Sequence, residues 1–143
     1  MKKYNILYDT ICELYNNSPE KYKEKYYRRV LSNSLGWANK TDVSRADMIR
    51  LIVDALGREC RYCGRTITAK NENNKFSLDH TIPQYRGGSQ DIENLEIICS
   101  RCNTRKGYMT ATEYELLLQF LEKTLDKEAR GYVLKKLAMW VQY

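Results

Sequence analysis

The sequence predicts an α+β protein that is predominantly helical and has a short strand-containing centre. Apolar residues recur at helical spacing in residues 1–57 and again in residues 108–143. Between them, residues 58–107 contain four of the five cysteines, the single histidine and four of the seven glycines. We therefore expect an N-terminal helical region, a central module, and C-terminal helices that pack on that module.

Residues 1–57 carry the start and stop signals of helices. Ser18 followed by Pro19 predicts a helix with Ser18 as N-cap and Pro19 as its first residue. Ser44, with Asp47 three residues later, resembles a capping box at the start of another helix. Gly57 is typical of a residue that follows a helix end.

The central module and the C-terminal region have signals of their own. Residues 76–82 and 95–98 are candidates for two short strands, and a glycine pair breaks the loop between them. Thr110 with Glu113 forms a capping box ahead of the C-terminal helices. The sequence thus predicts two strands between two helical regions.

The charge of the chain favours a polyanionic partner. It has 24 Lys and Arg against 18 Asp and Glu, a net charge of +6. Many basic proteins never bind nucleic acid, so this balance alone leaves the class of partner open. The N-terminus has no apolar run like a signal peptide, and no stretch approaches the ~18 apolar residues of a membrane span. We expect a cytoplasmic, intracellular protein without a membrane partner.

Two Cys-x-x-Cys pairs predict a metal site. Cys60 and Cys63 form the first pair, Cys99 and Cys102 form the second, and thirty-five residues separate the two pairs. Two residues between cysteines let both thiolates of a turn face one ion, and two such turns complete a tetrahedral Cys₄ site. A closed four-thiolate site is structural because it leaves no position for water. The alternatives are a redox dithiol and two chance pairs, but the doubled pattern favours structural Zn²⁺.

A second group of residues lies between and beside the cysteine pairs. A lone histidine is usually a satisfied polar residue, but Asp79 precedes His80, Asn94 follows fourteen residues later, and Asn103 directly follows Cys102. Hydrolysis of a phosphodiester needs a base near neutral pH, which an imidazole supplies, and a cation to neutralise developing charge. Mg²⁺ and similar hard ions prefer oxygen ligands such as a carboxylate and an amide.

These motifs together resemble the HNH family, the ββα-metal or His-Me finger nucleases, in its zinc-knuckle form. The matching motifs, which cover about fifty residues, are the two cysteine pairs, Asp79-His80-x-x-Pro83, Gly87-Gly88, Asn94-Leu95 and Cys102-Asn103-x-x-Lys106. The resemblance implies that His80 is the general base and that Asp79 and Asn103 hold a catalytic Mg²⁺ or Mn²⁺. It implies that Asn94 holds the loop and orients His80 through the backbone. Asn103 stands where many members have a final histidine.

The implied activity is metal-dependent endonucleolytic hydrolysis of DNA, by nicking or by double-strand cleavage. One such site cuts one strand, so a double-strand break requires a homodimer or two successive events. The alternative is a non-catalytic zinc module that binds DNA or a protein partner. The combination of Asp79, His80 and Asn103 argues against this alternative because a binding module has no need of all three.

Basic residues in two places are candidates for phosphate contacts, with solvated surface charge as the alternative. Arg86, Arg105 and Lys106 lie in or near the catalytic motifs. The helix after Pro19 carries a second group, whose tyrosines are expected to pack inward while its cations face solvent. The cations of that group are Lys21, Lys25 and Arg28.

Overall fold

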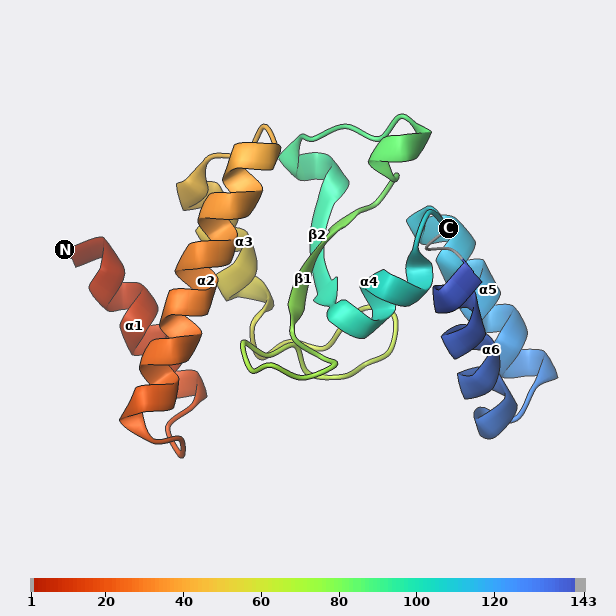
Figure 1. Cartoon of the computed structure of the whole chain (residues 1–143), viewed down its shortest axis with the longest axis horizontal. Coiled ribbons are helices and arrows are strands. Elements are labelled where there is room, and N and C mark those ends of the chain that lie inside the picture. Colours follow the sequence, from red (N-terminus) through yellow and green to blue (C-terminus); the bar gives the residue numbers. More distant parts are fainter. Residues whose placement is uncertain (1, 141–143) are drawn as a thin grey trace.

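The computed structural model describes the backbone of residues 2–140 and the side chains of residues 6–137. Its elements, in chain order, are α1 (Lys2–Leu14), α2 (Glu20–Lys40), α3 (Arg45–Ala55), β1 (Phe76–His80), β2 (Leu95–Cys99), α4 (Ser100–Lys106), α5 (Ala111–Thr124) and α6 (Lys127–Trp140). Helices α1 to α3 lie on one side of the two-stranded sheet, and α5 and α6 lie on the other, beyond α4 (Figure 1). The predicted α+β fold, mainly helical around two strands and a following helix, is confirmed.

The predicted N-cap of α3 agrees with the structure, whereas the predicted N-cap of α2 does not. The Ser44 hydroxyl accepts a hydrogen bond from the backbone N–H of Asp47 at 3.1 Å, so it caps α3 as expected. The prediction of Ser18 as the N-cap of α2 is wrong, because Pro19 takes that position without a side-chain cap. The Ser18 N–H instead donates to the Tyr15 carbonyl at 2.9 Å, which holds Ser18 in the turn after α1.

The sheet is an antiparallel pair in which Phe76 lies opposite Cys99 and His80 lies opposite Leu95. Strand β1 ends at His80, two residues earlier than the sequence suggested. The reason is that the Asn94 side chain bonds both the N–H and the carbonyl of Ile82, which removes these groups from strand pairing. The register therefore places the end of β1 beside the start of β2. The two ends of the loop between the strands are held together by the hydrogen bonds between Asn94 and Ile82.

The core lies between the sheet and the N-terminal helices. Phe76 and Ile98 from the sheet are buried together with Met48 and Ile52 of α3. The ring of Trp37, on α2, meets the Phe76 ring edge-on with centroids 5.6 Å apart. These contacts fix the sheet against α2 and α3, so that the C-terminal end of α2 lies near the end of β1.

The C-terminal helices pack against the first cysteine turn and against α4. The capping box of Thr110 and Glu113 is present with both of its hydrogen bonds and starts α5. Tyr114, on α5, is buried and packs edge-on against Tyr62, whose ring lies 4.9 Å away between centroids. Across residues 2–140, none of the helices is both long enough and apolar enough to cross a membrane.

Candidate active site and cysteine cluster

Each cysteine pair lies in a tight turn. In the first turn, the N–H of Gly64 donates to the Cys60 carbonyl at 2.9 Å, and Gly64 has a φ of 74°, a conformation that favours glycine. In the second, Cys99 ends β2 and its Sγ accepts the N–H of Cys102 at 3.4 Å. Both turns therefore aim their two thiols in one direction.

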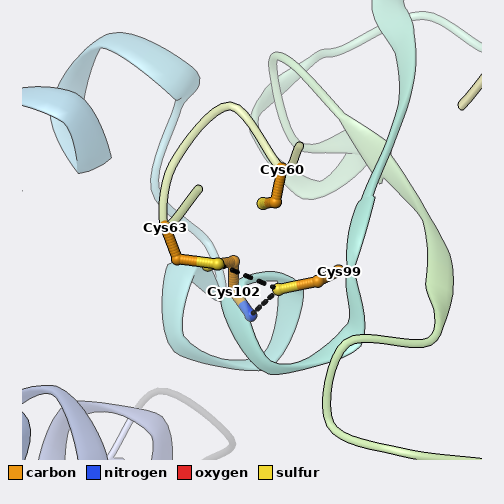
Figure 2. A group of neighbouring side chains, drawn as sticks. All are labelled: Cys60, Cys63, Cys99 and Cys102. Carbon is orange, nitrogen blue, oxygen red and sulfur yellow. Dashed lines mark hydrogen bonds between the residues drawn. The ribbon is translucent and has the colours of Figure 1, made fainter. Parts of the chain in front are cut away.

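The four thiols meet at one point (Figure 2). Their sulfur atoms all lie within 4.8 Å of one another, and Cys63 Sγ is 3.6 Å from Cys99 Sγ. A tetrahedral zinc ion with Zn–S bonds of about 2.3 Å sets its sulfur ligands about 3.8 Å apart. The cluster therefore has the ligand number and the spacing that a structural zinc ion requires.

The ionisation of these thiols also favours a bound cation. A hydrogen bond with Cys102 lowers the pKa of Cys60, and the same contact raises the pKa of Cys102. The ionised form of Cys60 is thus favoured, while ionisation of Cys102 is disfavoured. Four thiolates this close together would repel one another. A divalent ion removes that repulsion and lets all four act as thiolates.

Three of the predicted site residues, Asp79, His80 and Asn103, line a hollow at the end of β1. This hollow has a volume of about 270 Å³ and is formed by β1, the short 3₁₀ helix of residues 84–86, and the end of α4. It is lined by Leu78, Asp79, His80, Pro83, Gln84, Tyr85, Asn103, Gly107 and Tyr108. The structure therefore brings Asp79, His80 and Asn103 together, although they come from two different elements.

Asp79 presents one carboxylate oxygen without a partner. The residue is 4% exposed, and its Oδ1 accepts a hydrogen bond from Lys106 Nζ at 3.0 Å. Its Oδ2 is buried and has no hydrogen-bond partner among the described residues. Burial raises the pKa of Asp79, and the Lys106 ammonium opposes that rise. A buried carboxylate oxygen that lacks a donor is the position in which a cation would be stabilised.

Asn103 is held with its carbonyl oxygen available. Its Nδ2 donates to Ser77 Oγ at 2.7 Å and to the Leu78 carbonyl at 3.0 Å. Since a carbonyl can only accept, the second bond fixes which end of the amide is nitrogen. The amide oxygen of Asn103 and the carboxylate of Asp79 form a hard oxygen donor set, which fits Mg²⁺ or Mn²⁺ and does not fit a soft ion.

His80 lies between this hollow and a second one. The second hollow, of about 520 Å³, is lined by Trp37, Lys40, Thr41, Leu78, His80, Gln84 and Gln90. His80 Nε2 is 2.7 Å from Gln90 Oε1, and the Gln90 carbonyl accepts the Asp42 N–H at 3.1 Å. The sequence did not indicate Lys40 or Gln90, because neither follows a motif spacing. Lys40 reaches the site through the packing of α2, and Gln90 reaches it through the loop between β1 and β2.

Asn94 organises the loop that follows β1. Its Oδ1 accepts the Ile82 N–H at 2.9 Å, and its Nδ2 donates to the carbonyls of Ile82 and Ser89 at 3.0 and 2.8 Å. The Thr81 N–H donates to the Asn94 carbonyl at 2.8 Å. Gly88 completes this arrangement, since a Cβ there would lie 1.7 Å from the Ile82 carbonyl oxygen. Among the described residues, Asn94 is connected to His80 only through the backbone of this loop.

The basic residues near the site do not all fit phosphate contacts. The prediction for Lys106 is wrong, because its side chain is 1% exposed and its ammonium bonds Asp79 and the His80 carbonyl. Arg86 is half-exposed but forms an ion pair with Glu113 of α5. Arg105 lines a different hollow, on another face of α4. Lys106 is therefore part of the interior of the site and does not belong to its rim.

The cations of α2 lie on the protein surface, as expected. Lys21, Lys25 and Arg28 are exposed, and Arg28 pairs with Glu24 at 2.8 Å. Nineteen residues of helix separate Lys21 from Lys40, which corresponds to about 28 Å. These cations are therefore far along α2 from the end that lines the His80 hollow, and their contact with DNA stays a prediction.

The tyrosines of α2 only partly follow the expectation that they pack inward. Tyr26 and Tyr27 are half-buried and pack against the core. Tyr22 is 41% exposed, and the Lys21 ammonium lies over its ring at 5.1 Å from the centroid. Of these three tyrosines, Tyr26 and Tyr27 therefore pack inward, and Tyr22 does not.

Replacing Lys106 with methionine is expected to destabilise the protein by about 3–5 kcal/mol, because it leaves the Asp79 carboxylate buried without its cation. Burial already raises the pKa of Asp79, and loss of Lys106 raises it further. The loss of stability should therefore be greatest above that pKa and shrink as the pH falls and the carboxyl takes a proton. Urea unfolding across a pH series, compared with wild type, measures this difference.

The matched control for this change is Arg28→Met, which breaks the exposed ion pair with Glu24. It should cost less than about 0.5 kcal/mol at every pH. A Lys106→Met variant as stable as the control, or one whose loss of stability grows toward acid pH, would contradict the structural role given to the buried pair.

Comparison with known proteins identifies the central segment. A family model described as HNH endonuclease matches residues 60–108, a range that includes the four clustered cysteines. Over 66 residues, the chain is 41% identical to the CRISPR-associated endonuclease Cas9 of Corynebacterium diphtheriae, and the match covers 45% of this chain and 6% of that protein. No solved structure gives a significant match. Residues 60–108 of this chain are therefore similar to the domain described as HNH endonuclease.

Proposed function

We propose that this protein is a metal-dependent endonuclease that hydrolyses phosphodiester bonds of DNA in the hollow at the end of β1. The observation that carries the proposal is that Asp79, whose Oδ2 is buried without a partner among the described residues, lines one hollow together with His80 and Asn103. A hard-oxygen pair beside an imidazole supplies both of the groups that phosphodiester hydrolysis requires.

His80 serves as the general base. Its hydrogen bond with Gln90 Oε1, an acceptor, places the ring proton on Nε2 and leaves the lone pair on Nδ1. Nδ1 then takes a proton from a water molecule in the hollow as that water attacks phosphorus. The bond from phosphorus to the 3′ oxygen breaks, which leaves a 5′-phosphate on one product and, after protonation, a 3′-hydroxyl on the other.

Asp79 and Asn103 would hold the catalytic divalent ion through Oδ2 and the amide oxygen. When bound, such an ion neutralises the charge that develops on the phosphate and on the leaving oxygen. Lys106 positions Asp79 through Oδ1 and ties it to the His80 carbonyl at 2.9 Å. The Lys106 ammonium thus fixes the position of the proposed metal ligand Asp79 relative to the proposed base His80.

The cysteine cluster supports this site mechanically. Cys102 and Asn103 are neighbours at the start of α4, so a zinc ion bound by the four thiols would fix the position of Asn103 relative to β1. The zinc would have no part in the chemistry, because four protein ligands close its coordination.

Replacing Asp79 with asparagine is expected to raise the Mg²⁺ concentration needed for half-maximal cleavage by at least about tenfold. The change removes the ionised ligand but keeps an oxygen that can accept from Lys106, so the fold should survive. Initial rates of cleavage of an end-labelled duplex, measured across Mg²⁺ and Mn²⁺ series, give this value. The same gels identify the end groups of the products.

Glu96→Gln is the matched control, since Glu96 lies opposite Asp79 in the sheet and pairs with Arg61 instead of lining the hollow. Its metal requirement should change by less than about twofold. Equal metal requirements in wild type and Asp79→Asn would exclude Asp79 as a ligand of the catalytic ion.

The alternative is a zinc-stabilised module that binds DNA or a protein without cutting. The exposed cations of α2 agree with such a module, but they give no reason for a carboxylate, an imidazole and an amide around one hollow. Duplex binding with unchanged DNA ends in Mg²⁺, Mn²⁺ and Ni²⁺ would favour this alternative.

A further inference from the structure

A third hollow lies between α4 and α6, on a different face of α4 from Asn103. It has a volume of about 400 Å³ and is lined by Asn73, Ser100, Arg101, Thr104, Arg105 and Lys135. Three of these six residues are cations and none is acidic. Its composition therefore differs from that of the hollow at the end of β1, where Asp79 supplies a carboxylate.

The three cations have no acidic partner among the described side chains. Among the ion pairs of the described side chains, none includes Arg101, Arg105 or Lys135. By contrast, Arg61, on the surface of the first cysteine turn, pairs with both Glu96 and Glu115. The Nε of Arg101 is in addition buried without a hydrogen-bond partner. Like charges held together without a counter-charge repel one another, and a bound anion would relieve that repulsion.

The hollow has a defined shape because the loop that borders it is pinned to α4. The Asn73 carbonyl accepts hydrogen bonds from the Arg101 N–H at 3.0 Å and from Ser100 Oγ at 2.9 Å. Arg101 and Arg105 are four residues apart, so they share one face of the helix. Lys135 reaches the same place from α6, which packs against α4 (Figure 1). Guanidinium groups in such an arrangement suit the oxygens of a phosphate.

The hollow cannot hold the phosphate that is cut. Asn103 lies two residues from Arg101 and from Arg105, which places it about 160° around the helix axis from both. A helix with its side chains is about 10–12 Å across, so an anion between α4 and α6 lies roughly that far from the Asp79 hollow. DNA carries one charge per about 1.7 Å of its axis and so presents other phosphates at this distance.

We propose that Arg101, Arg105 and Lys135 form a subsite for a backbone phosphate of the nucleic acid, away from the bond that is cut. The subsite rests on the proposed function for the identity of its ligand, and it binds without regard to base sequence. It anchors the substrate across α4, so its loss weakens DNA binding.

The test is fluorescence anisotropy with a labelled duplex, over a salt series and without an added divalent ion, so that nothing is cut. Lys135→Gln and Arg105→Gln should each raise the Kd about 3- to 10-fold and reduce the slope of log Kd against log salt by about 1. The matched control is Lys123→Gln, an exposed lysine of α5 that lines none of these hollows, and it should change the Kd by less than about 2-fold. Zinc content and unfolding curves confirm that each variant is folded.

Three results would overturn the subsite. One is a Kd of Lys135→Gln and Arg105→Gln equal to that of Lys123→Gln, and another is a wild type that does not bind the duplex. The third comes from calorimetry with inorganic phosphate at matched ionic strength: phosphate binding lost in Lys135→Gln while duplex binding is unchanged would indicate a small-anion site. Because binding is measured without cleavage, a wild type that binds through these residues but does not cut would refute only the proposed function.

Discussion

Replacing His80 with alanine is expected to lower the single-turnover rate of DNA cleavage by about 10²- to 10⁴-fold, the contribution of a positioned general base. His80 is the only histidine of the chain, and its ring lies between the two hollows that meet at the end of β1. No other imidazole can take over the proton transfer. An end-labelled duplex, cut by excess enzyme in Mg²⁺, gives the rate of the chemical step directly.

The loss should be confined to the chemistry. Among the described residues, the His80 ring makes one hydrogen bond, to Gln90, and the residue is only partly buried, so its removal should cost little stability. Zinc content, unfolding midpoint and duplex Kd should all match wild type. Gln84→Ala is the control, because Gln84 lines the same two hollows but carries no group that titrates near neutral pH. A His80→Ala rate within about 3-fold of wild type would exclude a general-base role.

Replacing Cys60 with serine is expected to abolish zinc binding and unfold the central module. Cys60 is 2% exposed within the cluster, and the described structure gives it no disulfide partner. Structural zinc contributes about 10–16 kcal/mol in small zinc-finger peptides, whereas a whole domain is stable by only about 5–15 kcal/mol. Elemental analysis should find about one zinc ion per wild-type chain and little in the variant, together with loss of the cooperative thermal transition.

Cys12 supplies the control for this result. It is a partly buried cysteine of α1 that lies outside the cluster, so Cys12→Ser should keep the zinc and the thermal transition. A strong chelator should reproduce the effect of Cys60→Ser on wild type. Folded, untagged protein that contains no zinc would contradict the structural role of the four cysteines.

Local signals predicted much of the fold because they act over a few residues. The caps at Ser44 and Thr110 start α3 and α5 as expected, since each satisfies a backbone N–H three residues away. The spacing of each cysteine pair similarly predicts a turn that faces one ion. The early end of β1 was not predicted, because the Asn94 side chain that causes it comes from twelve residues beyond Ile82.

The buried position of Lys106 was in principle predictable from helix geometry. Cys102 must face the other thiols, and Lys106 follows it by four residues, so both share the inward face of α4. The presence of Lys106 on the helix of Asn103 suggested a phosphate contact, but adjacency along a helix does not mean a shared face. Its partner Asp79 lies twenty-seven residues away and appears only once the sheet is formed.

Other parts of the site depend wholly on packing. Lys40 and His80 line one hollow because α2 docks on the sheet through Trp37 and Phe76. Lys135 joins Arg101 because α6 packs on α4. No periodicity or motif of the sequence relates Lys40 to His80 or Lys135 to Arg101, so the sequence alone could not place Lys40 and Lys135 beside these residues.

The most direct test of the central claim is nicking of supercoiled plasmid DNA by the zinc-loaded wild type in Mg²⁺, run beside His80→Ala at equal zinc content. We predict conversion to the open-circular form by wild type, and no conversion by the variant or in the absence of a divalent ion. An intact plasmid after incubation with wild type, or nicking by His80→Ala at the wild-type rate, would contradict the assignment of the Asp79, His80 and Asn103 hollow as a nuclease active site.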